Sequence, residues 1–299
     1  MKTSDWGLLL LLSVLWGGSF FFIEVALASL SPFSLVAVRV TLAALVLYLF
    51  MKIKQEGVPR NLAAWKSFLV MGCLNNVIPF CLIVWGQTQI SGGLASILNA
   101  TTPFFALVLA HFLTADEKLS VTKVVGLLIG FVGVIVIFGS DLLSEVGSQT
   151  FAQFAILAAA FSYGLAGIFG RRFKAMGISP MATATGQLTS SAVIMLPLAF
   201  LLEEPLSLMS AEANVIASVI GLAVLSTSLA YVLYFRILAT AGATNLLLVT
   251  FLIPVSAILL GGLVLQEQLG SHQLLGMCII FLGLIVIDGR ILRRFKSKV

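Results

Sequence analysis

The chain has 299 residues, of which 60% are hydrophobic and only 10% are charged, and its formal net charge is +5. A mean hydropathy of +1.13 excludes a soluble globular protein, in which about a quarter of the residues are charged. The positive charge does not indicate a nucleic-acid partner, because the basic residues lie in short connections between apolar blocks, where they interact with anionic lipid.

Ten apolar blocks follow one another along the chain. Each is about 18 to 25 residues long, which at about 1.5 Å per residue is enough to cross a hydrocarbon core of roughly 30 Å. We therefore predict an all-α polytopic membrane protein with ten transmembrane helices. In chain order the predicted spans cover residues 7–28, 33–51, 66–86, 91–113, 121–139, 151–170, 178–202, 213–235, 243–265 and 272–289.

The distribution of Lys and Arg predicts the orientation of these spans. Sixteen of the 17 basic residues lie in the two tails and in every second connection or at its edge, and the other five connections contain none. Because cytoplasmic loops retain Lys and Arg, both termini are predicted to be cytoplasmic. The remaining basic residue, Arg39, lies inside the second predicted span.

The second half of the chain repeats the first at offsets of 147 to 151 residues. The matching elements are Trp16-Gly17 with Tyr163-Gly164, Ser31-Pro32…Arg39 with Ser179-Pro180…Gln187, and Pro103…Glu117…Gly126…Gly133 with Pro254…Glu267…Gly276…Gly283. Five spans per repeat is an odd number, so the second repeat is predicted to enter the membrane from the opposite side. The predicted units are residues 1–140 and 151–290, with an outer linker at 141–150 and a basic cytoplasmic tail at 291–299.

These elements, in this order and spacing, resemble the EamA domain. Two such domains in tandem are similar to the ten-span drug/metabolite transporter superfamily, and the resemblance covers about residues 7–290. It implies a multi-pass protein of the cell membrane, most often the bacterial inner membrane, with spans 5 and 10 at its periphery. It also implies a secondary transporter that exports amino acids or related metabolites by alternating access around a midplane cavity between the repeats. The second repeat departs from the first at Gln187 and Tyr163.

Two ionisable residues lie well inside predicted spans, where charge is costly unless it is paired or hydrated. Glu24 and Arg39 are expected at similar depths on neighbouring helices, because the connection between spans 1 and 2 is short. In one interpretation they form an intramembrane charge pair that only locks these helices together. In the other, Arg39 binds a substrate carboxylate, while Glu24 is its counter-ion or carries protons.

Uncharged polar and aromatic residues gather in the middle of several spans. Amides and hydroxyls in hydrocarbon seek partners, so they either bind substrate or join neighbouring helices. Trp16 and Tyr163 are related by the repeat and lie away from the interfacial belt where such residues concentrate, although core packing would explain them equally well. The predicted substrate-binding residues are Trp16, Asn75, Asn76, Asn99, Tyr163, Thr227, Tyr231 and Thr250.

Pro103 and Pro254 are predicted to lie inside spans 4 and 9. A proline within a helix removes a hydrogen bond and bends the helix, so the two prolines are either static kinks or gating hinges. Their presence at related positions of both repeats favours hinges.

Other functions are less well supported by the residues. An integral membrane enzyme would need clustered carboxylates, a metal-binding set or a Ser/His couple at one depth, and the two His residues are expected near opposite faces. A nucleotide-sugar or sugar-phosphate antiporter of the same superfamily would need several cations in the cavity, whereas Arg39 alone lies in a span interior. We expect a monomer that interacts with a small-molecule substrate and the lipid bilayer, without a metal or cofactor.

Overall fold

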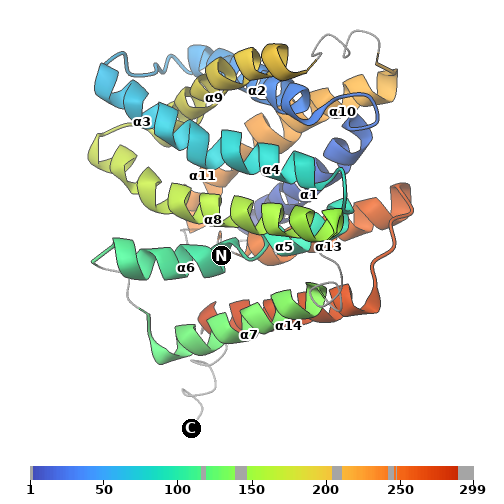
Figure 1. The fold of residues 1–299 in the computed structure, drawn as a ribbon. Helices are drawn as coiled ribbons and strands as arrows, with labels where there is room; N and C mark the ends of the chain where they lie inside the picture. The colour runs from blue at the N-terminus through green and yellow to red at the C-terminus, as the bar shows by residue number, and fades with distance from the viewer. Residues whose placement is uncertain are drawn as a thin grey trace.

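The computed structural model describes residues 3–115, 119–138, 147–203, 211–241, 246 and 248–288, and within these ranges every regular element is helical. The predicted tail at 291–299, Glu117 and residues 141–146 of the predicted linker lie outside this description. The helices pack as one bundle (Figure 1).

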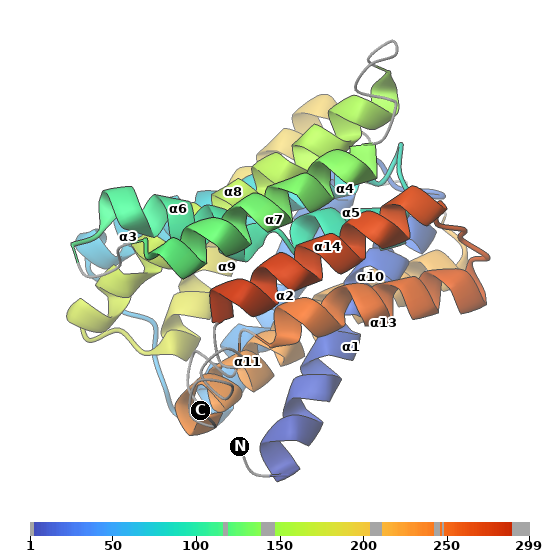
Figure 2. The same ribbon diagram turned by 90° about the horizontal axis from the view of Figure 1, so that it is seen from below.

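The helices of the first repeat are α1 (Thr3–Ala26), α2 (Pro32–Ile53), α3 (Leu62–Gly72), η1 (Cys73–Val77), α4 (Ile78–Gly86), α5 (Gly92–Asn99), α6 (Thr102–Leu113) and α7 (Val121–Phe138). Those of the second repeat are α8 (Ser148–Ala175), α9 (Pro180–Leu202), α10 (Ala213–Ala223), η4 (Val224–Leu229), α11 (Ala230–Ala241), α13 (Val249–Val264) and α14 (Ser271–Asp288). Here η1 and η4 are π-helical turns inside longer continuous helices. Within the bundle, α1, α10 and α11 run obliquely to α7 and α14 (Figures 1 and 2).

Seven helical segments of the described chain are long and apolar enough to cross a membrane, and three further apolar helices are shorter. The three shorter ones, Val121–Ile137, Val249–Val264 and Ser271–Ile287, correspond to predicted spans 5, 9 and 10. The sequence prediction of a helical membrane protein is therefore confirmed, whereas the count of ten full spans stays a prediction.

Related helices of the two repeats pack side by side in opposite directions. In the pair α2 and α9, Ser34 near the start of α2 contacts Glu203 at the end of α9, while Met51 near the end of α2 contacts Thr185 near the start of α9. The pair α7 and α14 is also antiparallel, because Gly126 lies against Gly283 while Gly133 lies against Gly276. A two-fold axis in the membrane plane would place related helices in this way.

The helices α7 and α14 form the layer at one edge of the bundle, as the views from the side and from below both show (Figures 1 and 2). A Cβ atom added to Gly133 would lie 2.8 Å from the Gly276 carbonyl oxygen, and one added to Gly283 would lie 2.6 Å from that of Gly126. The glycines therefore allow backbone-to-backbone contact, which is how helices associate closely in lipid. This pair lies apart from the central cavity described next.

Candidate functional site

A cavity of about 640 Å³ lies between the two repeats. Its wall is formed by α1, α2, α3, η1, α4, α5 and the first residue of α6 in the first repeat, and by α8, α9, η4, α11 and α13 in the second. Seven of the eight residues predicted to bind substrate line it: Trp16, Asn75, Asn99, Tyr163, Thr227, Tyr231 and Thr250. The eighth, Asn76, is fully buried behind the wall.

The repeated aromatic–glycine pairs place two aromatic side chains on this wall. Gly17 packs against the α13 backbone near Ala257, and Gly164 packs against the α6 backbone near Ala106. In both contacts an added Cβ would come within about 3.0 Å of a backbone nitrogen. The close approach of these helices positions Trp16 and Tyr163, the residues that precede the glycines, at the cavity.

Both π-helical turns carry polar residues of the site. In η4, the Thr227 and Ser228 hydroxyls donate to the carbonyls of Leu222 and Ala223, five residues earlier, at 2.8 and 2.9 Å. In η1, the Leu74 carbonyl accepts a hydrogen bond of 2.7 Å from Ser162 of α8. These hydroxyls satisfy carbonyls of the widened turns, and π-helical turns are frequent at functional sites.

Each π-helical turn is joined to the opposite repeat by a hydrogen bond between related positions. Arg39 Nε of α2 donates to Thr227 Oγ1 of η4 at 3.0 Å. In the related contact, Asn75 Nδ2 of η1 donates to Gln187 Oε1 of α9 at 3.2 Å. Arg39 and Gln187 thus play matching roles at the centre of the molecule, but only one of them carries charge.

A chain of hydrogen bonds extends from Asn75 into the wall. Asn75 Nδ2 also donates to the Tyr231 hydroxyl at 2.9 Å, and that hydroxyl donates to Asn76 Oδ1 at 3.2 Å. Asn76 Nδ2 in turn donates to Ser191 Oγ at 3.1 Å. Asn76 therefore holds Tyr231 in place from behind the cavity wall.

Arg39 and Glu24 do not form an ion pair in the described part of the chain, which corrects the predicted pairing. The Arg39 guanidinium carbon lies 3.7 Å from the centre of the Phe80 ring, and Arg39 is only 6% exposed. Glu24 instead accepts a hydrogen bond of 3.3 Å from Gln87 Nε2. The reason is that Arg39 faces η4 and α4, whereas Glu24 faces the turn that follows α4.

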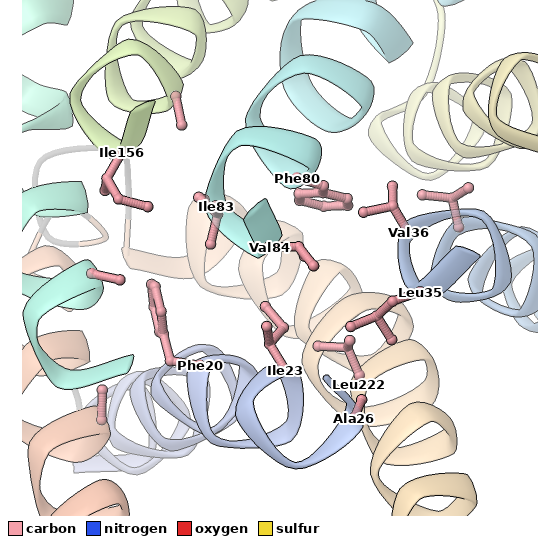
Figure 3. Packing of buried hydrophobic residues seen from close by; sticks show 14 of the residues in the cluster. Phe20, Ile23, Ala26, Leu35, Val36, Phe80, Ile83, Val84, Ile156 and Leu222 are labelled. Atoms are coloured by element: carbon pink, nitrogen blue, oxygen red, sulfur yellow. The ribbon is translucent and has the colours of Figure 1, made fainter. Parts of the chain in front are cut away.

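The cavity has one open and one closed end. We call the end where α8 finishes and α9 begins the open end, because the lining residues there, Lys174 and Pro180, are exposed. At the opposite end, where α1 finishes and α2 begins, the lining residues Ile23 and Ile83 are 1% and 5% exposed. Figure 3 shows these two side chains in a cluster of buried apolar residues from α1, α2, α4 and α10 that also includes Leu222.

Two carboxylates join the repeats at the closed end. Glu203, which ends α9, accepts hydrogen bonds from the Phe33 and Ser34 backbone N–H groups at the start of α2, at 3.2 and 2.7 Å. Glu267, which follows α13, accepts from the Gly92 and Gly93 N–H groups at the start of α5, at 3.3 and 3.0 Å. A carboxylate at a helix N-terminus is stabilised by the unpaired N–H groups and by the helix dipole.

The two prolines predicted as hinges have different surroundings. Contrary to expectation, Pro103 does not kink a continuous helix: the predicted fourth span is interrupted between α5 and α6, and Pro103 lies in the first turn of α6. Its missing N–H leaves the Asn99 carbonyl without a helical donor, and the Thr102 hydroxyl donates to that carbonyl instead at 2.8 Å. Pro254 does lie inside α13.

Aromatic residues of the wall include some that were not predicted. Phe80 lies below the Arg39 guanidinium, and the Tyr234 ring lies 5.7 Å from that of Trp16. Tyr234 follows Tyr231 by three residues on α11, so the helical period alone places it on the same face. Phe80 had no such signal, because a phenylalanine in an apolar span is ordinarily lipid-facing or packed.

Comparison with known proteins identifies the architecture. The EamA-like transporter family matches residues 6–139 and again 150–288. A crystal structure with 17% sequence identity superposes with a TM-score of 0.69 over 99% of each chain, which shows a common fold.

Two relatives illustrate the range of named proteins similar to this chain. An uncharacterized transporter of Bacillus subtilis, YoaV, is 28% identical over 91% of this chain and 92% of its own. A probable amino-acid metabolite efflux pump of Escherichia coli is 27% identical over 96% of this chain and 95% of its own. With matches to both halves, this multi-pass membrane protein belongs to the EamA-like transporter family, as a tandem pair of EamA repeats.

Proposed function

We propose that this protein is a secondary transporter that exports amino acids or related small metabolites across the bacterial inner membrane. The observation that carries the proposal is the cavity of about 640 Å³ between the repeats, with one open and one closed end. Its size is in the range of small-molecule sites. The similarity to proteins named as amino-acid metabolite efflux pumps supports the substrate class.

The mechanism we propose is alternating access. In the ten-span topology expected from the basic residues, both termini and the open end are cytoplasmic, so the structure represents an inward-facing state. The antiparallel packing of α2 with α9 and of α7 with α14 supports an inverted repeat, in which exchanging the conformations of the two repeats would open the other end. The Glu203 and Glu267 contacts hold the outer end closed in the present state.

Filling the cavity tests this proposal. Gly167 of α8 lines the cavity, and outside its own helix no described atom lies within 4 Å of an added Cβ, so the Cβ of Gly167→Trp meets no obstacle there and its ring is expected to fill part of the cavity. In proteoliposomes loaded with labelled amino acids, the wild type should show saturable exchange, and Gly167→Trp should reduce the rate at least tenfold.

The matched control is Gly7→Trp, because Gly7 is an exposed glycine of α1 that does not line the cavity, and an added Cβ there also meets no described atom outside its own helix within 4 Å. It should transport at the wild-type rate. Flux that rises linearly with substrate concentration would indicate a channel instead, and equal rates in the two variants would exclude this cavity as the pathway.

A further inference from the structure

The charged side chains on the described cavity wall are all positive. Arg39 and Lys174 are the charged residues among the described residues that line it, and no Asp or Glu of the described chain joins them there. Lys174 is exposed at the open end, whereas Arg39 is buried at the centre. A cation kept at membrane depth needs compensation by a partner or a ligand.

The protein contacts of Arg39 leave most of its donors unused. A guanidinium has five N–H groups, and the Nε group donates to Thr227. The ring of Phe80 covers one face. The two terminal nitrogens of Arg39 donate no hydrogen bond to the described residues, and no carboxylate of that part of the chain lies within 4.0 Å of the guanidinium. The terminal nitrogens form the fork that binds a carboxylate through two parallel hydrogen bonds.

The rest of the wall is suited to an apolar body. Trp16 and Tyr234 are in ring contact, and the rings of Tyr231 and Phe235 stack with centres 6.2 Å apart. All four line the cavity together with Tyr163. The described wall therefore offers one buried cation and broad aromatic surfaces, but no carboxylate that would pair with a substrate ammonium.

Building on the proposed function, we infer that the site recognises its substrate by a carboxylate that Arg39 binds and by an apolar body, and that it does not require an ammonium group. Deaminated monocarboxylates should then be ligands alongside amino acids with apolar side chains. One buried guanidinium matches a single negative charge, which disfavours phosphate esters that carry about two.

Three probes of similar shape separate the two charged groups: phenylalanine, 3-phenylpropionate without the ammonium, and phenethylamine without the carboxylate. Binding to the purified full-length protein in nanodiscs would be measured by calorimetry, because the neutral form of phenylpropionate crosses lipid and obscures transport assays. Phenylalanine and phenylpropionate should bind within about threefold of each other, and phenethylamine at least tenfold more weakly.

Arg39→Gln should remove this preference, so that both carboxylates bind at least tenfold more weakly while phenethylamine is unchanged. A glutamine is expected to fold here because Gln187 occupies the related position of the second repeat, and a thermal unfolding curve checks this. The matched control, Lys174→Gln, removes the other cation of the wall and should retain the preference. Should Arg39→Gln be unstable, Thr227→Val leaves the charge but removes the Nε partner, and it should weaken the two carboxylates by a few fold.

Three results would overturn the inference. Equal binding of phenethylamine and phenylpropionate by the wild type would do so, as would an unchanged preference in Arg39→Gln. In both cases saturable amino-acid exchange in proteoliposomes would leave the proposed transport function intact. If the wild type neither binds the probes nor exchanges any amino acid, both the inference and the proposed function fail.

Discussion

The two ends of the cavity are built from related helices, yet they are held in different ways. At the closed end, Glu203 and Glu267 each hydrogen-bond the start of a helix in the other repeat, and apolar side chains from four helices fill the space between (Figure 3). At the open end, Lys174 and Pro180 remain exposed. The closed end therefore combines two carboxylate contacts between the repeats with buried apolar side chains, whereas lining residues of the open end are exposed.

The largest expected effect is a difference in cysteine labelling between the two ends of the cavity, which shows which end faces the outside of the cell. Single cysteines at Gln89, in the exposed turn after α4, and at Ala175, at the exposed end of α8, lie at the closed and open ends respectively. In a variant without Cys73, Cys81 and Cys278, an impermeant thiol reagent added to sealed cells should label only the first. Labelling only the second would reverse our assignment of the open end to the cytoplasm.

A smaller effect is expected when the contacts at the closed end are weakened, which should shift the equilibrium between its closed and open forms. Replacing both Glu203 and Glu267 with Gln removes two charges from helix N-termini, at a cost of roughly 2 kcal/mol in total. The equilibrium between closed and open forms of this end should then move by about thirtyfold. A cysteine at Ile83, which is 5% exposed, should react correspondingly faster with a reagent supplied from that end.

The matched control for the closed end is Glu212→Gln. Glu212 also precedes a helix, α10, but its side chain makes no capping hydrogen bond. Glu212→Gln therefore removes a negative charge at a helix start without removing a capping contact, and the reactivity of the Ile83 cysteine should stay as in the wild type. Acceleration by both substitutions would mean that general charge, rather than these two contacts, controls the closed end.

The smallest expected effect is a difference between Asn75, on the cavity wall, and Asn76, behind it, in how their replacement changes substrate affinity and stability. Asn76→Ala removes fully buried hydrogen bonds to Ser191 and from Tyr231, and should lower the free energy of unfolding by about 1 kcal/mol. Asn75→Ala removes bonds to Gln187 and Tyr231 where the cavity can supply replacements, so it should affect substrate affinity more than stability. Thermal unfolding and calorimetric binding measured on the same samples would show whether the two neighbours differ in this way.

Much of the architecture follows from patterns that act over whole segments. Apolar length predicts membrane helices, and the regular offset between the halves predicts the tandem EamA repeats. The pairs Trp16-Gly17 and Tyr163-Gly164 were informative because a glycine contact and a cavity-facing aromatic residue recur together in both repeats. Polar residues at mid-span pointed to the cavity wall, because hydrocarbon penalises polar groups elsewhere; their role in binding substrate stays a prediction.

Features that depend on a few contacts were not predictable in this way. Depth along the helices placed Glu24 and Arg39 at one level, but depth does not specify the face of a helix, and the two side chains point to different neighbours. The fourth span is interrupted just before Pro103, and the Thr102 hydroxyl replaces the helical donor that this proline lacks. Phe80 became part of the site only because Arg39 lies on its ring.

Each π-helical turn adds one residue to its helix, and this extra residue determines which side chains of the following segment face the cavity. A π turn accommodates one residue more than an α turn, so the segment that follows is rotated by about 100° relative to an uninterrupted α-helix. In α11, Tyr231 and Tyr234 follow η4, and their direction is set by that extra residue. Deleting a single residue from Val224–Leu229 is expected to rotate both rings away from the cavity. In the proposed transporter, the number of residues in these helices would therefore decide which side chains line the cavity, just as their identity does.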